Sequence, residues 1–250
     1  MEFDKDKLQW LEFDLLKEYP WISHGVFLRH GGLSRAPFHS LNLSDAVGDH
    51  PDNVKANREL VRQVIKVPQI VYAKQEHKAY VLEITSANIS KIPAADALFT
   101  RLKDVGLAIT HADCQAAIIY DPANEVIAAV HAGYKGLGLN IYKEVIQSLK
   151  QKVNSKPKDL IVCISPSLGP DHAEFINYKT ELPEYFWEYQ KKPQYFDLWM
   201  IGVNQLLDIG IQKKNIEISE ICTYCTSPDY YSHRKDKKTG RNATIVAMQS

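Results

Sequence analysis

Residues 107–133 read LAITHADCQAAIIYDPANEVIAAVHAG, and this stretch decides the fold. Its apolar runs are short and are broken by polar turns, which is the pattern of buried strands. These runs cover residues 107–110, 116–120 and 126–131. The turn residues Asp-Pro-Ala-Asn at 121–124 predict a hairpin that folds the second run back onto the third. The sequence therefore predicts a β-sheet core built around this segment.

Further helices and strands are expected on both sides of this core. Apolar residues at helical spacing predict helices over residues 5–19, 51–65, 139–153 and 198–209. Short apolar runs predict strands over residues 24–30, 69–73, 80–84, 160–164, 216–221 and 244–248. Strands and helices are interspersed without a repeat or a flexible linker. We therefore expect a mixed α/β or α+β sandwich that forms a single domain across residues 1–250.

Composition limits the classes of function. The chain has 250 residues, and 30 Lys and Arg balance 30 Asp and Glu, so its net charge is zero. A general binder of nucleic acid or of membrane surfaces would need an excess of positive charge. No run of about 18 apolar residues could cross a bilayer, and the charged start lacks a signal-peptide pattern. We therefore expect a soluble, cytoplasmic protein that binds neither nucleic acid nor membrane.

Two reactive side chains stand at strand ends in the core stretch. Cys114, in His-Ala-Asp-Cys, comes soon after the first strand, and His131 ends the third strand 17 residues later. The hairpin would bring this thiol and imidazole together, and strand ends are where α/β folds place their sites. His77, between two predicted strands, is a third candidate. One Cys and two His suit zinc and leave one position open for water or substrate.

The other candidate thiols are a Cys-x-x-Cys pair, Cys222 and Cys225. No second pair exists to complete a site of four cysteines. The pair precedes Ser-Pro and does not open a helix, which argues against a thioredoxin-like redox motif. We therefore predict a structural role with no part in binding the catalytic ion. Replacing Cys225 with Ser is expected to leave the metal content unchanged.

Two segments combine cations with glycines or a turn and could bind anions. Arg29 and His30 precede Gly31-Gly32, where backbone N–H groups can be reached by a ligand. Residues 232–241 are strongly basic, and Arg234 follows two tyrosines closely enough to point inward. A solvated hairpin turn explains the second segment equally well. Glycine loops of this kind are weak signals on their own.

Many short segments, taken together and in order, resemble one known family. They are Arg29-His30-Gly31-Gly32-Leu33-Ser34, Ser40-Leu41-Asn42-Leu43, Val47-Gly48-Asp49, Asn57-Arg58, Gln75-x-His77, Ala95-Asp96-Ala97, His111-Ala112-Asp113-Cys114, Tyr120-Asp121-Pro122, Ala129-Val130-His131-Ala132-Gly133 and Cys222-Thr223-Tyr224. From about residue 24 to 248 the chain resembles the multicopper polyphenol oxidase, or laccase-domain, family. Its members are also described as zinc-dependent purine nucleoside phosphorylases and as peptidoglycan editing factors.

The resemblance implies a fold of layered mixed β-sheets flanked by helices, with zinc held by His77, Cys114 and His131. The activity it implies is phosphorolysis of purine nucleosides such as adenosine, inosine and methylthioadenosine, with adenosine deamination beside it. Copper and laccase labels are also attached to the family, so copper is the alternative metal. Laccase chemistry needs a type 1 copper and a trinuclear centre. The nine histidines form no His-x-His pair, so the ligands fit one zinc better than a multicopper cluster.

The implied reaction needs cations and hydrogen-bond donors around phosphate and around the leaving base. The cations expected to bind phosphate are Arg29, Lys135 and Arg234. Asp113, beside the cysteine ligand, is expected to orient a ligand or to move a proton, although it could equally cap a turn. The residues expected to contact the substrate are His30, Asn42 and Tyr134. The expected partners are therefore a small-molecule nucleoside and phosphate, while the sequence leaves the oligomeric state open.

The sequence departs from the family pattern at three places, one of them beside the first ligand, where Glu76 and Lys78 replace smaller residues. Family members often have Trp-Arg after His-Ala-Gly, whereas this chain has Tyr134-Lys135, which keeps a ring and a cation but loses the planar guanidinium. Cysteines often follow Gly169-Pro170 in the family, and Asp171-His172 stand there in this chain. The three ligand positions are intact, so the departures bear on the substrate more than on the metal.

Two other interpretations stay open on the sequence. Cys114 could be a nucleophile with His131 as its base and no metal, as in cysteine deamidases. Alternatively, the chain could be a scaffold without catalytic activity that binds a partner, since a buried Cys is commonly a small apolar side chain. Metal content and turnover of nucleosides would separate these interpretations.

Overall fold

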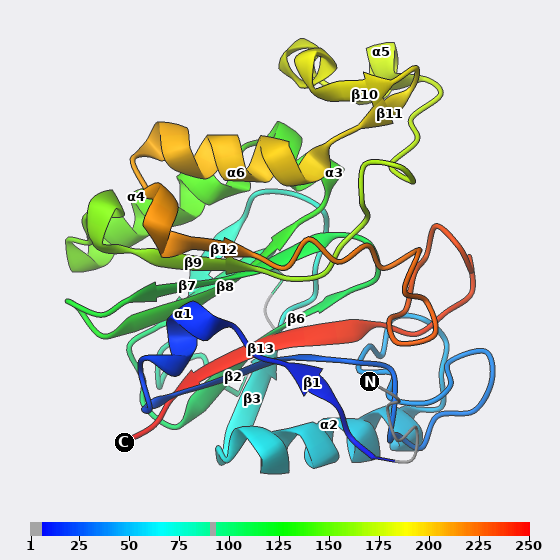
Figure 1. The fold of residues 1–250 in the computed structure, drawn as a ribbon. Helices are drawn as coiled ribbons and strands as arrows, with labels where there is room; N and C mark the ends of the chain where they lie inside the picture. The colour runs from blue at the N-terminus through cyan, green and yellow to red at the C-terminus, as the bar shows by residue number, and fades with distance from the viewer. Residues whose placement is uncertain (1–6, 91–93) are drawn as a thin grey trace.

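Two β-sheets stack face to face, and helices cover their outer faces (Figure 1). The computed structural model describes residues 7–90 and 94–250. The first sheet has the strand order β1 (Trp10–Leu11), β2 (Ile22–Phe27), β13 (Asn242–Met248), β6 (Val105–His111) and β3 (Gln69–Tyr72). The second has the order β12 (Ile216–Ile218), β9 (Ile161–Ile164), β7 (Gln115–Asp121), β8 (Val126–Ala132), β5 (Ala97–Thr100) and β4 (Val81–Glu83). Both sheets mix parallel and antiparallel pairs, which confirms the expected fold class.

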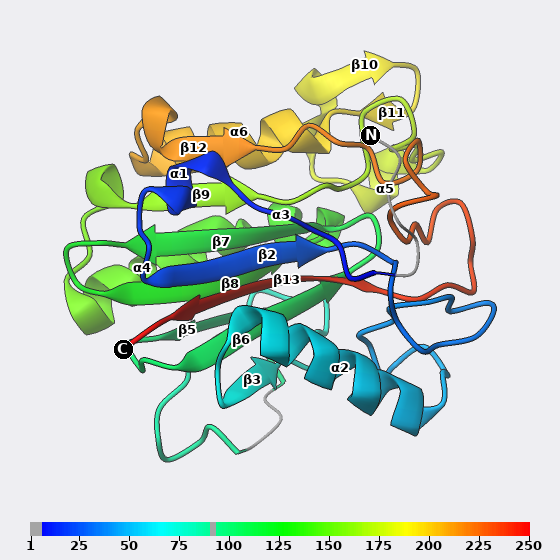
Figure 2. The same ribbon diagram turned by 60° about the horizontal axis from the view of Figure 1, so that its bottom comes forward.

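Helices flank the sheets on opposite sides, as two views show (Figures 1 and 2). Helix α2 (Pro51–Ile65) covers the first sheet, and α4 (Ile141–Val153) and α6 (Leu198–Ile209) cover the second. The shorter elements are α1 (Asp14–Lys17), α3 (Tyr134–Gly138), α5 (Tyr178–Glu181), three 3₁₀ turns (Pro157–Asp159, Glu184–Tyr189, Lys213–Asn215) and a ribbon of β10 (Gln190–Lys192) and β11 (Tyr195–Phe196). Within the described ranges, no helix combines the length and the apolar character that a bilayer crossing requires.

The alternation of side chains along the strands builds three apolar layers. On β7, Ala117 and Ile119 pack in the layer beneath α4 and α6, whereas Ile118 and Tyr120 pack between the two sheets. On β6, Ala108 belongs to the third layer, which faces α2. Burial on both faces explains why these strands are apolar at nearly every position and not only at alternate ones.

The predicted hairpin of the core stretch is confirmed. β7 and β8 pair in antiparallel register along their whole length, from Gln115 to Asp121 on β7. The Asp121 carboxylate accepts hydrogen bonds from the backbone N–H groups of residues 123 and 124 at 3.0 and 3.1 Å, the usual role of Asp in a tight turn. This pairing places the end of β8, and therefore His131, beside the start of β7.

The chain crosses from the first sheet to the second at two loops. One loop, residues 73–80, leads from β3 to β4, and the other, residues 112–114, leads from β6 to β7. β3 and β6 are parallel neighbours, so both loops leave the first sheet at the same end. The Gln75 side chain ties them together, because its amide accepts from the Thr110 N–H at 2.9 Å and donates to the Thr110 carbonyl at 2.8 Å. Each crossing loop carries one predicted metal ligand.

The helix expected over residues 5–19 is wrong. Residues 5–6 lie outside the described ranges, and the rest of the segment forms β1, which pairs with β2, followed by the short α1. Its leucines do not share one face. Leu8 packs in the layer facing α2, whereas Leu16 packs between the sheets.

Other boundaries differ less from the expectation. Helices α2 and α6 begin and end at the predicted residues. α4 begins at Ile141 and not at residue 139, because α3 precedes it and Asn140, in the left-handed conformation, caps its start. The strand β5 and the segment 173–197 with α5, β10 and β11 were not anticipated. The single domain across residues 1–250 stays a prediction.

Candidate metal centre

His77, Cys114 and His131 converge where the chain crosses between the sheets. Their candidate ligand atoms all lie within 4.8 Å of one another. The two imidazole rings are perpendicular, with centroids 4.7 Å apart, and both lie close to the Cys114 sulfur. His131 is buried, Cys114 is half-buried and His77 is exposed. The convergence inferred from the strand ends is therefore present.

Asp96 orients both histidines from a fully buried position. Its Oδ1 accepts from His131 Nδ1 and from the His77 backbone N–H, each at 2.9 Å. Its Oδ2 accepts from the Lys78 backbone N–H at 2.8 Å. Because Nδ1 of His131 is engaged, Nε2 is the nitrogen left for a metal, an arrangement common behind metal-binding histidines. Asp96 belongs to one of the family motifs, but nothing in its local sequence indicates these partners.

The electrostatics of this set favour a thiolate. Burial raises the pKa of Cys114, but the neighbouring His131 and His77 outweigh burial and lower it to about 6. Burial also disfavours charge on His131, yet Cys114 and Asp96 outweigh it and raise the pKa of this imidazole to about 9. The thiolate is the form of cysteine that binds metals.

The donor set and the space around it fit a zinc ion. One thiolate and two imidazoles are typical zinc ligands that leave a fourth position open. Gly133 keeps that space clear, because a Cβ there would lie 2.9 Å from the Cys114 sulfur and 3.5 Å from the His77 ring. A multicopper cluster would need more imidazole ligands than these.

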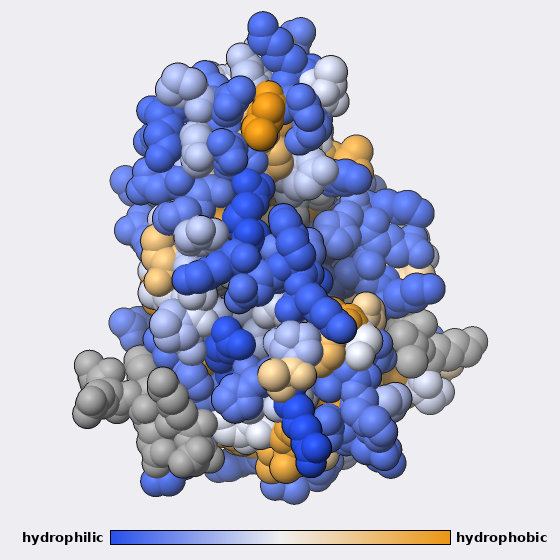
Figure 3. Space-filling view, turned by 90° about the vertical axis from the view of Figure 1, so that its right-hand side faces the viewer, coloured by the Kyte–Doolittle hydropathy of each residue, from blue (hydrophilic) through white to orange (hydrophobic). Residues whose placement is uncertain are grey.

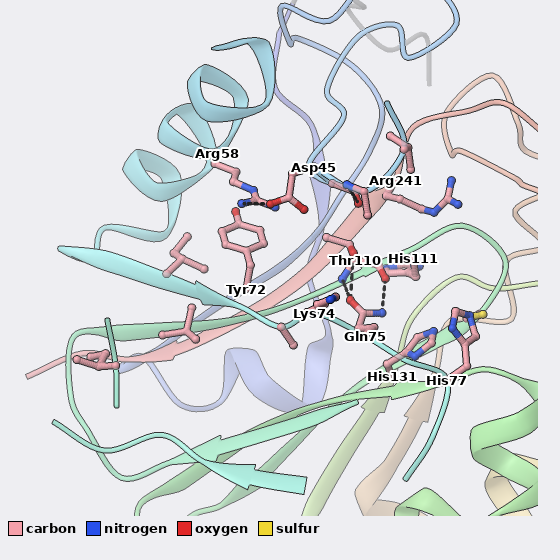
Figure 4. Close-up of a pocket in the computed structure, with 18 of the residues that line it drawn as sticks. Asp45, Arg58, Tyr72, Lys74, Gln75, His77, Thr110, His111, His131 and Arg241 are labelled. Atoms are coloured by element: carbon pink, nitrogen blue, oxygen red, sulfur yellow. Dashed lines mark hydrogen bonds and ion pairs between the residues drawn. The ribbon is translucent and has the colours of Figure 1, made fainter. Parts of the chain in front are cut away.

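Two cavities meet at the ligand set, and His77 and Cys114 line both. The larger, of about 680 Å³, has walls that include Arg58, Tyr72, Lys74, Gln75, His111 and Arg241. Figure 4 shows Arg58 and Tyr72 at one end of this cavity and His77 and His131 at the other. The smaller, of about 230 Å³, has walls that include Tyr134, Leu168, Phe175, Leu198, His233 and Arg234. The end of the molecule where β13 begins has a largely hydrophilic surface (Figure 3).

Three of the residues expected to bind or turn over substrate line the smaller cavity, namely Asp113, Tyr134 and Arg234. The Asp113 carboxylate accepts hydrogen bonds from the Thr223 hydroxyl at 2.8 Å, the Ser232 hydroxyl at 2.6 Å and the Arg234 backbone N–H at 2.5 Å. These bonds favour the orienting role of Asp113, because they hold the segment that carries Arg234 against the loop that carries Cys114.

Arg29 does not line either cavity. Its Nε and Nη2 donate to the carbonyl of His39 at 3.1 and 2.9 Å, and its Nη1 donates to the carbonyl of Ser227 at 2.9 Å. The guanidinium also lies over the Tyr231 ring, 4.5 Å from its centroid. Arg29 therefore joins two loops, and the structure gives no support to the phosphate contact expected of it.

His30, Asn42 and Lys135 also lie outside the walls of both cavities. His30 Nε2 contacts the Asp229 carboxylate at 2.8 Å. Asn42 is fully buried, and its side-chain oxygen accepts from the Arg241 backbone N–H at 3.0 Å. Lys135 is exposed at the start of α3. Asn42 thus acts on the larger cavity indirectly, by positioning Arg241.

The cations of the larger cavity were not anticipated. They are Arg58, Lys74 and Arg241, which come from α2, the first crossing loop and the residue before β13. The Arg58 guanidinium stacks on Tyr72, 4.0 Å from the ring centroid. Arg58 belongs to the family motif Asn57-Arg58, so the resemblance marked its position but not its place in the cavity. Arg241 ends the basic segment 232–241, which the sequence marked as a possible anion site, whereas Lys74 gives no such signal.

A second ligand set forms from the cysteine pair and a residue that the sequence marks only as a departure. His172, Cys222 and Cys225 each offer a ligand atom, and these atoms lie within 4.8 Å of one another. His172 stands 50 residues before Cys222, so the spacing of the cysteine pair gave no sign of this third residue.

The fold and the ligand set are those of a layered α/β protein with a candidate metal centre between two sheets, and relatives are found among named enzymes. Residues 23–249 match the family model described as "Multi-copper polyphenol oxidoreductase laccase", so the chain belongs to this family. It is 30% identical to "Purine nucleoside phosphorylase YlmD" of Bacillus subtilis, over 90% of this chain and 88% of that protein. It is 28% identical to "Purine nucleoside phosphorylase" of Bacteroides thetaiotaomicron, over 95% of both chains.

Solved structures agree with this placement. YlmD from Geobacillus stearothermophilus superposes with a TM-score of 0.87 at 26% identity, covering 96% of each chain. The hypothetical protein YfiH of Bacillus licheniformis superposes with a TM-score of 0.86 at 27% identity, covering 93% of this chain and 95% of that chain. The likeness spans both sheets and the helices around them.

Proposed function

We propose that this chain is a zinc-dependent purine nucleoside phosphorylase. The observation that carries the proposal is the convergence of His77, Cys114 and His131 between two cavities, in a chain whose relatives bear that name. Phosphorolysis joins two reactants at one atom, the ribose C1′. Two compartments that share ligand residues suit such a reaction, because each reactant can occupy its own compartment and both reach the same ligands.

The sizes of the cavities suggest which reactant each one takes. We assign the nucleoside to the larger cavity, whose volume of about 680 Å³ lies in the range of small-molecule sites. Ile70 and Val71 give this cavity apolar wall for a purine ring. We assign phosphate to the cavity of about 230 Å³, where Arg234 offers the charged, paired donors that suit phosphate.

The residues of this chain would then act mainly by positioning. Phosphate attacks C1′ while the purine leaves, so negative charge must be stabilised at the junction of the cavities. Zinc held by the three ligands would supply a Lewis acid there. Asp113 holds the Arg234 backbone, so the guanidinium is directed before phosphate arrives. Asp96 keeps the proton on Nδ1 of His131.

Substitution of Arg234 with Ala tests the assignment. Charge-assisted hydrogen bonds are worth about 1.5–3 kcal/mol, so kcat/KM for phosphate should fall about ten- to hundredfold. KM for adenosine, inosine or methylthioadenosine should change less. The control is Lys103→Ala, which removes an exposed cation paired with Glu125 and should change neither constant. Release of free base that is equally fast without phosphate would contradict the proposal.

Adenosine deamination belongs to the same proposal as a side activity. Zinc held by His77, Cys114 and His131 would supply the Lewis acidity that assists attack of water on the amino-bearing carbon of the purine, with ammonia as the leaving group. Zinc is preferred to copper because a multicopper cluster would need more imidazole ligands than the two present. Ammonia release from adenosine without phosphate would measure this activity separately from base release.

A second candidate function is supported by one specific observation. The Cys114 sulfur lies close to the His131 imidazole, whose Nδ1 hydrogen-bonds Asp96, which is the order of nucleophile, base and orienting carboxylate in cysteine hydrolases. A metal-free hydrolase needs only one imidazole beside the thiol, however, and His77 presents a second. A metal site accounts for His77, Cys114 and His131 together. Turnover that survives complete removal of zinc would favour the cysteine nucleophile.

A further inference from the structure

The side chains of His172, Cys222 and Cys225 form a compact cluster apart from both cavities. The Nδ1 of His172 lies 3.7 Å from the Cys222 sulfur and 3.5 Å from the Cys225 sulfur. Both thiols are free. None of the three residues lines the cavities described above, so the proposed phosphorolysis gives them no task.

These distances are those of ligands that share a tetrahedral zinc ion. With Zn–S near 2.3 Å and Zn–N near 2.0–2.1 Å, a tetrahedral angle separates sulfur from nitrogen by about 3.6 Å. The two observed separations, 3.7 and 3.5 Å, bracket that value. Two thiolates and an imidazole are soft and borderline ligands that favour zinc over magnesium or calcium.

The surrounding chain holds the cysteines in this arrangement. Cys222 pairs with Ser167 in a parallel bridge, and its sulfur accepts the Gly169 backbone N–H at 3.3 Å. The hydroxyl of Thr226 donates to the Cys222 carbonyl at 2.7 Å, which closes the turn that returns Cys225 to Cys222. An N–H donated to a sulfur is a frequent support for a thiolate ligand.

The imidazole is also held in place. The His172 ring stacks on the Tyr224 ring at 4.1 Å with an interplanar angle of 19°. Its backbone N–H donates to the Gly169 carbonyl at 3.0 Å. A Cβ at Gly169 would lie 3.0 Å from the Cys222 Cβ, so a glycine allows these two segments to approach closely. Donors fixed in this way bind a metal with little reorganisation.

We propose that His172, Cys222 and Cys225 bind a second zinc ion, separate from the candidate catalytic site, with a fourth position open to water. The ion would join segment 167–175 to segment 222–235, which lie side by side (Figure 1). Both segments supply residues to the wall of the smaller cavity, and Arg234 already bridges them by donating from Nη1 to the Glu174 carbonyl at 2.8 Å. The role of this ion is structural. The proposed site replaces the expectation that Cys225→Ser leaves the metal content unchanged.

Metal counting on the full chain tests the proposal without reference to activity. The protein is purified under reducing conditions and loaded with zinc. Elemental mass spectrometry should then find two equivalents of zinc per chain. Cys225→Ser and Cys114→Ser should each hold one, and the double variant none. The matched control is Cys163→Ala, which removes a buried thiol outside both sets and should keep two. Equal zinc in Cys225→Ser and the unaltered chain would overturn the proposal.

Two further measurements keep the test decisive if a variant folds poorly. In the Cys114→Ser variant, cobalt bound at the second set should give charge-transfer absorption from the Cys222 and Cys225 thiolates. Adding His172→Ala to that variant should remove this absorption. Hydrogen exchange of residues 222–235 should quicken in Cys225→Ser and not in Cys163→Ala. A Cys222–Cys225 disulfide that persists in the reduced, zinc-treated chain would also overturn the site. The count from this set is independent of turnover, so its failure is distinguishable from failure of the phosphorylase proposal.

Discussion

The two ligand sets use the same two kinds of side chain, one Cys with two His in the first and two Cys with one His in the second, in different surroundings. Cys114 and His131 lie at strand ends and His77 lies in the loop between β3 and β4, and the buried Asp96 accepts from the His131 imidazole and from the His77 backbone N–H. The set of His172, Cys222 and Cys225 lies in loops, where an aromatic ring and backbone N–H groups hold it. Cys225 is exposed, whereas His131 is buried.

This difference separates a site for chemistry from a site for shape. The first set opens onto two cavities, so an ion there can be reached by two reactants. The second set opens onto neither cavity, and it joins two loop segments. Burial also strengthens electrostatic interactions, so perturbed pKa values of Cys114 and His131 accompany the first set. Ligand chemistry alone does not distinguish the two roles, whereas position in the fold does.

The sharpest way to separate the sets is a pair of glycine substitutions. Gly133→Ala places a Cβ 2.9 Å from the Cys114 sulfur, and Gly169→Ala places one 3.0 Å from the Cys222 Cβ and 3.2 Å from its sulfur. Gly133→Ala should release the first ion and lower turnover by about 100-fold or more. Gly169→Ala should release only the second ion and leave most turnover. Zinc counting beside a base-release assay reads both, and loss of the same ion from both variants would break the comparison.

Asp96→Asn should have the next largest effect. The amide offers one accepting oxygen where the carboxylate oxygens serve His131 Nδ1 and two or more backbone N–H groups. Loss of such support typically costs about 10- to 100-fold in metal affinity. Zinc titration against a competing chelator would measure it, and the second ion should be bound as before. Unchanged affinity at both sets would show that the carboxylate does not orient the ligands.

Arg29→Ala should have the smallest effect on catalysis. Its guanidinium donates to the carbonyls of His39 and Ser227, so the expected loss is one of stability, about 1.5–3 kcal/mol. Thermal unfolding would show it as a lower midpoint. The kcat/KM for phosphate should fall less than in Arg234→Ala. A fall as large as in Arg234→Ala would restore the phosphate role expected from the sequence.

What the sequence could predict was local. The strands of the core stretch, the turn at 121–124 and the helices α2 and α6 follow from periodicity and turn residues within a few positions. The convergence of Cys114 and His131 followed from one hairpin. Arg29 was expected to bind phosphate because Arg-His-Gly-Gly has the composition of an anion loop, whereas no local pattern indicates the carbonyls of His39 and Ser227 to which its guanidinium donates.

What the sequence could not predict depends on distant pairs. Asp96 meets His131 from 35 residues away, and His172 meets Cys225 from 53 residues away. The expected N-terminal helix failed for the same reason, since β1 forms only because β2 lies beside it. The spacing of residues along the chain does not predict such long-range contacts.

The position of β13 has a consequence for synthesis of the chain. This strand lies at the centre of the first sheet, between β2 and β6, yet it comprises residues 242–248. While a ribosome extends the chain, β2 and β6 must wait for more than a hundred further residues with an edge each unpaired. Such edges are prone to pair with other chains, so the nascent protein is exposed to aggregation. Asn242 pairs with His111 at the end of β6, so the loop that carries Cys114 gains this neighbour only after residue 242 has been synthesised.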